Sequence, residues 1–305
     1  MAAAKLLTDR VRSGDRVLFL TGFLIRELGR PETDGPVGAA SLARALCEAL
    51  GAVPVGVAEP ECLEAIEASF AAAGLVPMSI DRLGKPRYGC AVLPFTKDEQ
   101  DAEQAANELF DRLAPAAVVA IERPAANRNG RYHGGGGFDI SEFTSKTDAL
   151  FAVAQERGIA TIGVGDLGNE LGMGVIVEEV RELVPHGERC SCPCEGGIAA
   201  VLPADVAIVA NIANWGAHGI AACLAGLLGR VRLAHSPADE RRIVRACVEA
   251  GAVDPVTGTL RELVDGTGLE ANVALVELLR STVEIAITEL GSVEEYRASW
   301  RAFHV

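Results

Sequence analysis

The feature that most constrains the fold is a set of four short apolar runs, each ending abruptly in polar or glycine residues. They are RVLFLTG at 16–22, AAVVAIERP at 116–124, IATIGVGD at 159–166 and DVAIVANIANWG at 205–216. Short runs that are apolar on both faces are typical of parallel strands covered by helices on each side. We therefore predict four buried parallel strands at these positions.

Helical patterns alternate with these runs. Helices are predicted at 38–51, 60–74, 97–114, 145–158, 217–229, 238–251 and 270–290, with weaker strands at 53–59, 76–80 and 90–96. This alternation predicts an α/β fold with a doubly wound, mostly parallel sheet flanked by helices and a helical C-terminal part. We expect one α/β domain over 1–305, with its core at about 16–230 and the helical part at about 231–305.

Charge and composition exclude several classes of protein. The formal charge is −14, from 42 acidic and 28 basic residues, which argues against a nucleic-acid partner. No apolar run reaches the roughly 18 residues of a membrane span, and the segment MAAAKLLTDRVRSGDRVLFLTGF lacks a signal-peptide pattern. Eight cysteines in 305 residues are too few for a disulfide scaffold. We expect a cytoplasmic protein with no membrane partner, whose helix at 270–290 offers a homo-oligomer interface.

Polar side chains gather where the four predicted strands end. Because ligands bind beyond the carboxyl ends of the strands in open α/β sheets, these side chains are expected to line one crevice. In chain order they are Thr21; Glu122 and Arg123; Asp166, Asn169 and Glu170; and Asn211, Asn214 and Trp215.

The segment TDGPVG places Asp34 and Gly35 just before a predicted helix. The free N–H groups of a helix start suit a carboxylate or a phosphate. A turn followed by a helix cap is the equally good alternative. The segment is not a phosphate-binding P-loop, because the Lys-Ser/Thr pair is missing.

The glycine-rich stretch GVGDLGNELGMG at 163–174 fails the dinucleotide-binding pattern, because no G-x-G-x-x-G opens a long helix there. One interpretation is a structural glycine loop. The other makes Asp166 and Glu170 metal ligands or acid–base groups, and such oxygen ligands select Mg²⁺, Mn²⁺ or Ca²⁺ over zinc.

Two further loops allow more than one interpretation. The stretch ERPAANRNGRYHGGGGFDIS at 122–141 is either a lid over the crevice or a solvated loop. In CSCPC at 190–194, three alternate thiols could hold a soft metal, with nearby His186 as a fourth ligand. An ordinary cysteine-rich loop is the favoured interpretation of CSCPC.

Taken together and in order, four motifs resemble the D-glutamate cyclase family. They are TGF…ETDGPVGA, AIERP…NGRYH…GFDIS, GVGDLGNELGMG and ANIANWGAHG, and they span roughly residues 16–230. The sequence departs from the family pattern at Leu167 and Leu171, and the CSCPC loop is not part of that pattern. In longer members this unit forms the C-terminal domain.

The resemblance implies an intramolecular dehydration, in which D-glutamate closes to 5-oxo-D-proline and water is lost. Such a reaction needs a general base, neutralisation of the γ-carboxylate and orientation of the chain. No cofactor is required, although a divalent cation (Mg²⁺, Mn²⁺ or Ca²⁺) is compatible with the acids. Under this hypothesis the catalytic residues are Glu122, Asp166 and Glu170, of which Asp166 and Glu170 are also candidate metal ligands. The substrate-binding residues are Thr21, Asp34, Gly35, Arg123, Asn169, Asn214 and Trp215.

Two other functions fit the same crevice. A non-catalytic module that binds an amino acid or a nucleotide would need convergent donors but no acid–base groups. A metal-dependent hydrolase or phosphatase would use Asp34, Glu122 and Asp166. Acid-rich strand ends favour an enzyme over the binding module.

Overall fold

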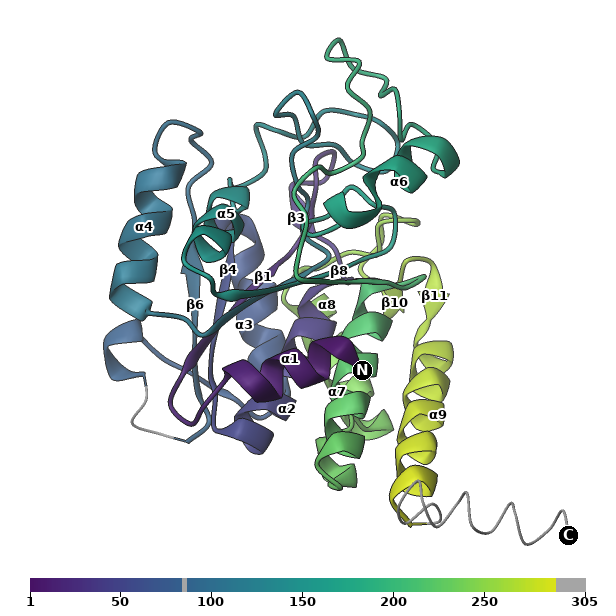
Figure 1. The fold of residues 1–305 in the computed structure, drawn as a ribbon. Coiled ribbons are helices and arrows are strands. Elements are labelled where there is room, and N and C mark those ends of the chain that lie inside the picture. Colours follow the sequence, from purple (N-terminus) through teal and green to yellow (C-terminus); the bar gives the residue numbers. More distant parts are fainter. Residues whose placement is uncertain (84–86, 289–305) are drawn as a thin grey trace, which may run out of the picture.

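The computed structural model describes residues 1–83 and 87–288. Seven parallel strands form one sheet in the order β5-β6-β4-β1-β7-β8-β9 (Figure 1). The strands are β1 Arg16–Thr21, β4 Val53–Ala58, β5 Val76–Pro77, β6 Gly89–Pro94, β7 Ala117–Ile121, β8 Ala160–Gly165 and β9 Val206–Val209. All seven predicted strands are present, so the prediction of a doubly wound α/β fold is confirmed.

Alternate residues of β1 pack into two separate cores, because successive side chains of a strand point to opposite faces. Val17 and Phe19 join the core made with α2 (Pro36–Leu50), α3 (Leu63–Ala72) and α7 (Ala213–Leu227). Leu18 and Leu20 join the core made with α4 (Ala102–Leu113) and α5 (Asp148–Glu156). Helices therefore cover both faces of the sheet (Figure 1).

The C-terminal part is helical, as predicted, in the described residues. Helices α8 (Pro237–Glu249) and α9 (Leu269–Thr288) follow the sheet, and α8 packs into the same core as α2 and α3. Residues 289–290 of the helix predicted at 270–290 lie outside the described part of the chain.

Several short elements were not predicted. They are the helices α1 Ala2–Arg10 and α6 Val177–Leu183, the hairpin of β2 Leu24–Ile25 with β3 Arg30–Pro31, and the hairpin of β10 Leu263–Val264 with β11 Thr267–Gly268. The hairpin strands have two residues each, which is too short for an alternating pattern to appear. These hairpins lie outside the ranges that we predicted to be helices or strands.

The chain reverses direction across the sheet between β1 and β7. From β1 it passes through α2 to β4 on one side, and it later returns to β7 on the other side of β1. This is the topological switch point, where open α/β sheets bind their ligands. Thr21 ends β1 and Glu122 directly follows β7, so two of the predicted site residues lie at this point.

Candidate active site

Three carboxylates meet beyond the switch point. Asp34, Glu122 and Asp166 each offer one oxygen, and these atoms lie within 4.8 Å of one another. Asp34 is fully buried and Glu122 is 7 % exposed. The strand-end argument therefore brings together the residues that follow β1, β7 and β8.

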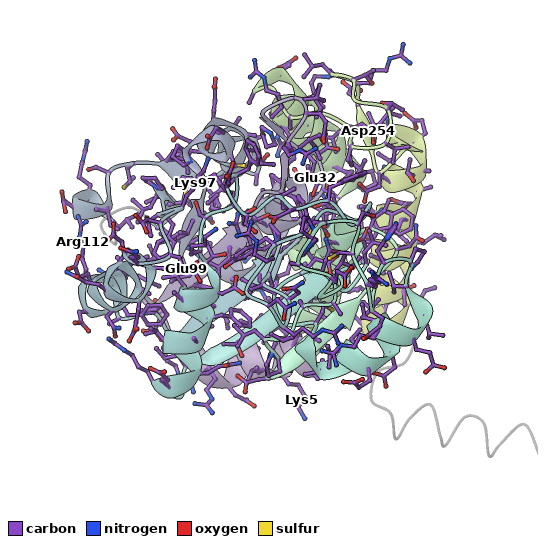
Figure 2. The ribbon with its side chains drawn as sticks, turned by 90° about the horizontal axis from the view of Figure 1, so that it is seen from above. Lys5, Glu32, Lys97, Glu99, Arg112 and Asp254 are labelled. Carbon is purple, nitrogen blue, oxygen red and sulfur yellow. The ribbon has the colours of Figure 1, made fainter. Side chains whose placement is uncertain are left out.

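Two more acids, Glu32 and Asp265, belong to the same electrostatic cluster. Glu32 is buried, and Figure 2 shows it well inside the outline of the molecule, whereas Arg112 and Lys5 lie at its edge. Asp265 follows β10 and interacts with Asp34. Sequence reasoning missed both residues, because they lie in segments without periodicity.

Burial raises the pKa of each of these five acids. Desolvation is the main cause for Glu32, Asp34 and Glu122, and repulsion between the like charges adds to it. For Asp166 the same two causes raise the pKa to about 10, and for Asp265 burial is the main cause of a pKa of about 6. Burial and mutual repulsion therefore favour the protonated forms of these carboxyl groups.

Within residues 1–83 and 87–288, no Lys, Arg or His side chain forms an ion pair with these acids. Several buried oxygens in the site also have no hydrogen-bond partner. They are Thr21 Oγ1, Glu32 Oε1, Glu122 Oε2, Asp166 Oδ1 and Asn169 Oδ1. Buried acceptors without donors are costly, so this arrangement suits a positively charged ligand.

The backbone is strained at two of these acids. Glu122 has φ 45° and Asp265 has φ 48°, in the left-handed region that L residues rarely adopt. The Glu122 N–H donates to Val164 O at 3.0 Å, which continues the pairing of β7 with β8 and holds the residue in place. Strain of this kind clusters at functional sites.

Asp34 and Asn214 cap each other's helices. Asp34 accepts the N–H groups of Ala213 at 2.7 Å and Asn214 at 2.8 Å, at the start of α7. Asn214 Oδ1 accepts the N–H groups of Gly35 at 2.9 Å and Gly38 at 2.6 Å, at the start of α2. The N–H groups that we expected to hold a substrate anion at Asp34–Gly38 are therefore occupied at these two glycines by the protein's own amide.

Gly35 is required by close packing as well as by its backbone conformation. It has φ 94°, and a Cβ placed there would lie 2.6 Å from Thr21 Oγ1 and 3.0 Å from Ile121 O. This contact positions the start of α2 against the ends of β1 and β7.

Glu170 shapes the glycine-rich segment. Its two carboxylate oxygens accept the N–H groups of Asp166 at 3.1 Å, Leu167 at 2.9 Å and Gly168 at 2.7 Å. A Cβ at Gly165 would lie 2.6 Å from the carboxyl carbon of Glu170, so the glycine makes room for this acid. Through these hydrogen bonds Glu170 holds the backbone at Asp166 in place. Asp166 belongs to the group of three converging carboxylates, whereas Glu170 does not.

Arg123 is placed differently from our expectation of a substrate-binding residue. It is fully buried and forms a two-pronged ion pair with Glu59, at 2.5 and 2.7 Å. Its remaining N–H groups donate to the oxygens of Gly22, Ser145 and Thr147. All five N–H donors of the guanidinium group thus bind oxygens of the protein itself. Arg123 therefore links the segments that carry Gly22, Glu59 and Ser145–Thr147.

The side chains of Asn169 and Trp215 also donate hydrogen bonds to other residues of the protein. The Asn169 amide donates to His133 O at 2.8 Å and leaves its own oxygen without a partner at the site. The Trp215 Nε1–H donates to Asn272 Oδ1 at 2.7 Å, and the ring lines a largely apolar groove beside α9. None of the clustered carboxylates lines that groove, so Trp215 does not contribute to the site as we expected.

The segment 122–141 is internally paired instead of being a merely solvated loop. Ala126 pairs with Tyr132, and His133 pairs with Asp139. The segment is joined to the glycine-rich segment through Ala125 N–H, which donates to Asn169 O at 2.9 Å. Its role as a lid stays a prediction.

The fold and the cluster define an α/β domain with a group of converging carboxylates at its switch point. The sequence model of the family described as D-glutamate cyclase-like, C-terminal, matches residues 1–280, and the chain belongs to this family.

The mitochondrial D-glutamate cyclase of Homo sapiens is similar to this chain, with 33% identity over 218 residues. The similar region makes up 68% of this chain and 32% of the human protein, so the chain matches about a third of that relative's length. In the described part of the chain, none of the helices combines the length and the apolar character that crossing a membrane requires.

Proposed function

We propose that the protein catalyses the ring closure of D-glutamate to 5-oxo-D-proline with loss of water. Family membership supports the reaction class, and the human relative is named for this activity. The observation that carries the proposal is the buried cluster of Asp34, Glu122 and Asp166, in which the unpartnered oxygens of Glu122 and Asp166 suit the ammonium group of an amino acid.

In this reaction the amine nitrogen bonds to the γ-carboxyl carbon and one carbon–oxygen bond breaks. The ammonium group gives up two protons, and the departing oxygen leaves with two protons as water. Glu122 and Asp166 are the acid–base pair in our proposal, because each has a raised pKa and an unpartnered oxygen. Entry of a positive charge lowers both pKa values, which lets one acid accept a proton while the other donates one.

A divalent cation also fits these residues. The donors are hard carboxylate oxygens from Asp34, Glu122 and Asp166, which Mg²⁺, Mn²⁺ and Ca²⁺ prefer. When bound, such an ion would neutralise the γ-carboxylate and polarise its carbonyl group. A cation is favoured here because Arg123 and the N–H groups of Gly35 and Gly38 already have partners within the protein.

NMR of the purified protein with D-glutamate and, separately, with L-glutamate tests the proposal. We expect conversion of the D form alone to 5-oxoproline, and we expect EDTA to reduce the rate. Failure to convert either form, with and without added Mg²⁺, Mn²⁺ or Ca²⁺, would contradict the proposed reaction.

The same three carboxylates also favour a second function, a metal-dependent phosphatase. Hydrolysis of a phosphate ester that depends on added Mg²⁺ or Mn²⁺, in a preparation that leaves D-glutamate unchanged, would support this alternative. Binding of D-glutamate without turnover would instead indicate an amino-acid-binding module.

A further inference from the structure

We propose that His133, Cys190, Cys192 and Cys194 form a structural zinc site. Their ligand atoms all lie within 4.8 Å of one another, although His133 is far from the cysteines in the sequence. The site is independent of the carboxylate cluster and of the proposed reaction.

The spacing of the ligand atoms fits one tetrahedral ion. Cys190 Sγ lies 3.5 Å from Cys192 Sγ and 3.4 Å from Cys194 Sγ. His133 Nε2 lies 3.2 Å from Cys192 Sγ and 3.6 Å from Cys194 Sγ. With Zn–S bonds of about 2.3 Å, the sulfur atoms of a tetrahedral site are separated by about 3.8 Å. These separations are also much longer than the roughly 2.05 Å of a disulfide bond.

The groups around the four ligands support a metal. His133 Nδ1 lies 3.2 Å from Arg131 O, so a proton on Nδ1 leaves the Nε2 lone pair for the ion. Cys194 Sγ accepts hydrogen bonds from Gly196 N–H at 3.4 Å and Asn127 Nδ2 at 3.6 Å, and such donors stabilise a thiolate. His133 is fully buried and Cys190 is nearly so.

The choice of metal follows from the donor atoms. Three sulfurs and one imidazole nitrogen form a soft set, which selects zinc over Mg²⁺ or Ca²⁺. Four protein ligands leave no open position for a reacting water, so the site is structural in type. The prediction that an ordinary cysteine-rich loop was the better interpretation is thus revised. The fourth ligand is His133, while His186 packs beside Gly137 instead.

The ion would join two loops that rise above the carboxyl ends of the strands (Figure 1). His133 belongs to the segment after β7, and the three cysteines belong to the segment between α6 and β9. The His133 carbonyl accepts the amide of Asn169, so the joined loops are also attached to the glycine-rich segment. Zinc would therefore hold together two loops that are attached to the glycine-rich segment carrying Asp166.

Metal analysis of the full chain, expressed without tags that bind metals and purified under reducing conditions, tests this site. We expect about one zinc ion per chain, with loss to background in Cys192→Ser. Cys223→Ser is the matched control, because Cys223 is a partly buried cysteine outside the cluster, and it should keep its zinc. Glu122→Gln should also keep its zinc, which separates this site from the carboxylates.

Cobalt substitution of the wild-type protein gives a second measurement, which does not depend on how well a variant folds. Reduced wild-type protein with Co²⁺ in place of zinc should show the visible absorption of a tetrahedral thiolate site. His133→Ala should lose or shift this spectrum, and His133→Cys should restore a tetrahedral site with four sulfurs. Absence of both zinc and the cobalt spectrum in reduced wild-type protein, or a disulfide within 190–194 in freshly purified protein, would overturn the proposal.

Discussion

The molecule carries two clusters of potential ligands that differ in how they are built. The carboxylate cluster stands at the ends of β7 and β8 and at the start of α2, and its donors are oxygens. The cluster of His133 and the three cysteines stands entirely on loops, and its donors are nitrogen and sulfur. Rigid strand ends are suited to placing reacting groups, whereas loops need an added link to hold their shape.

The largest expected effect is a loss of turnover without a loss of stability when an acid of the carboxylate cluster is replaced. Replacing Asp166→Asn should lower kcat for D-glutamate by about 10²–10⁴-fold, because it removes an acid–base group. The thermal midpoint should stay the same or rise, since the amide avoids the cost of burying a group that is ionised in the unfolded chain at neutral pH. Turnover by NMR and unfolding by circular dichroism measure the two effects. Glu99→Gln, at an exposed acid, is the control (Figure 2). Full turnover in Asp166→Asn would remove this residue from the mechanism.

The next effect concerns the pair of Arg123 and Glu59. Replacing Glu59→Gln leaves a buried guanidinium without its counter-charge, which should lower the free energy of unfolding by about 3–5 kcal/mol. The control, Glu61→Gln, breaks a partly exposed pair with Lys97 and should cost less than about 1 kcal/mol. Denaturant unfolding gives both values. Unchanged stability with a raised KM for D-glutamate would return Arg123 to the substrate-binding residues.

A smaller effect is expected when zinc is removed by a chelator with soft nitrogen donors. The sheet should survive, so the midpoint should fall by only a few degrees, about 1 kcal/mol for a chain of this size. Limited proteolysis should become faster within 184–198, because the loop loses its link to His133. Cys192→Ser should be cleaved quickly with or without the chelator. An unchanged cleavage pattern after complete loss of zinc would mean that the ion does not hold these loops.

The last prediction concerns the pH dependence of stability. Folding raises the Asp166 pKa from its ordinary value of 3.8 to about 10, so the folded state binds more protons between these values. Stability should therefore fall as pH rises through this window. Thermal midpoints between pH 5 and pH 9 should show the decline, and Asp166→Asn should flatten it. A steeper decline in the variant would contradict this assignment.

The difference between the two clusters also explains which of their residues could be predicted from the sequence. In a parallel sheet the strand ends share one edge, so Glu122 and Asp166 could be placed together from their apolar runs alone. Glu32 and Asp265 could not, because they lie in irregular segments whose path depends on tertiary packing. The partner of Arg123 is Glu59, 64 positions earlier, and no local pattern links the two. His133 is likewise 59 positions from Cys192, farther than the spacing of a recognisable zinc motif.

The reciprocal caps of Asp34 and Asn214 have a consequence for genetics. Position 34 serves the cluster and also holds the first turn of α7, while Asn214 holds the first turn of α2. A substitution at position 34 removes the side-chain cap of α7, and one at position 214 removes the side-chain cap of α2. Loss of activity in a variant at position 34 therefore does not by itself show that Asp34 takes part in the reaction.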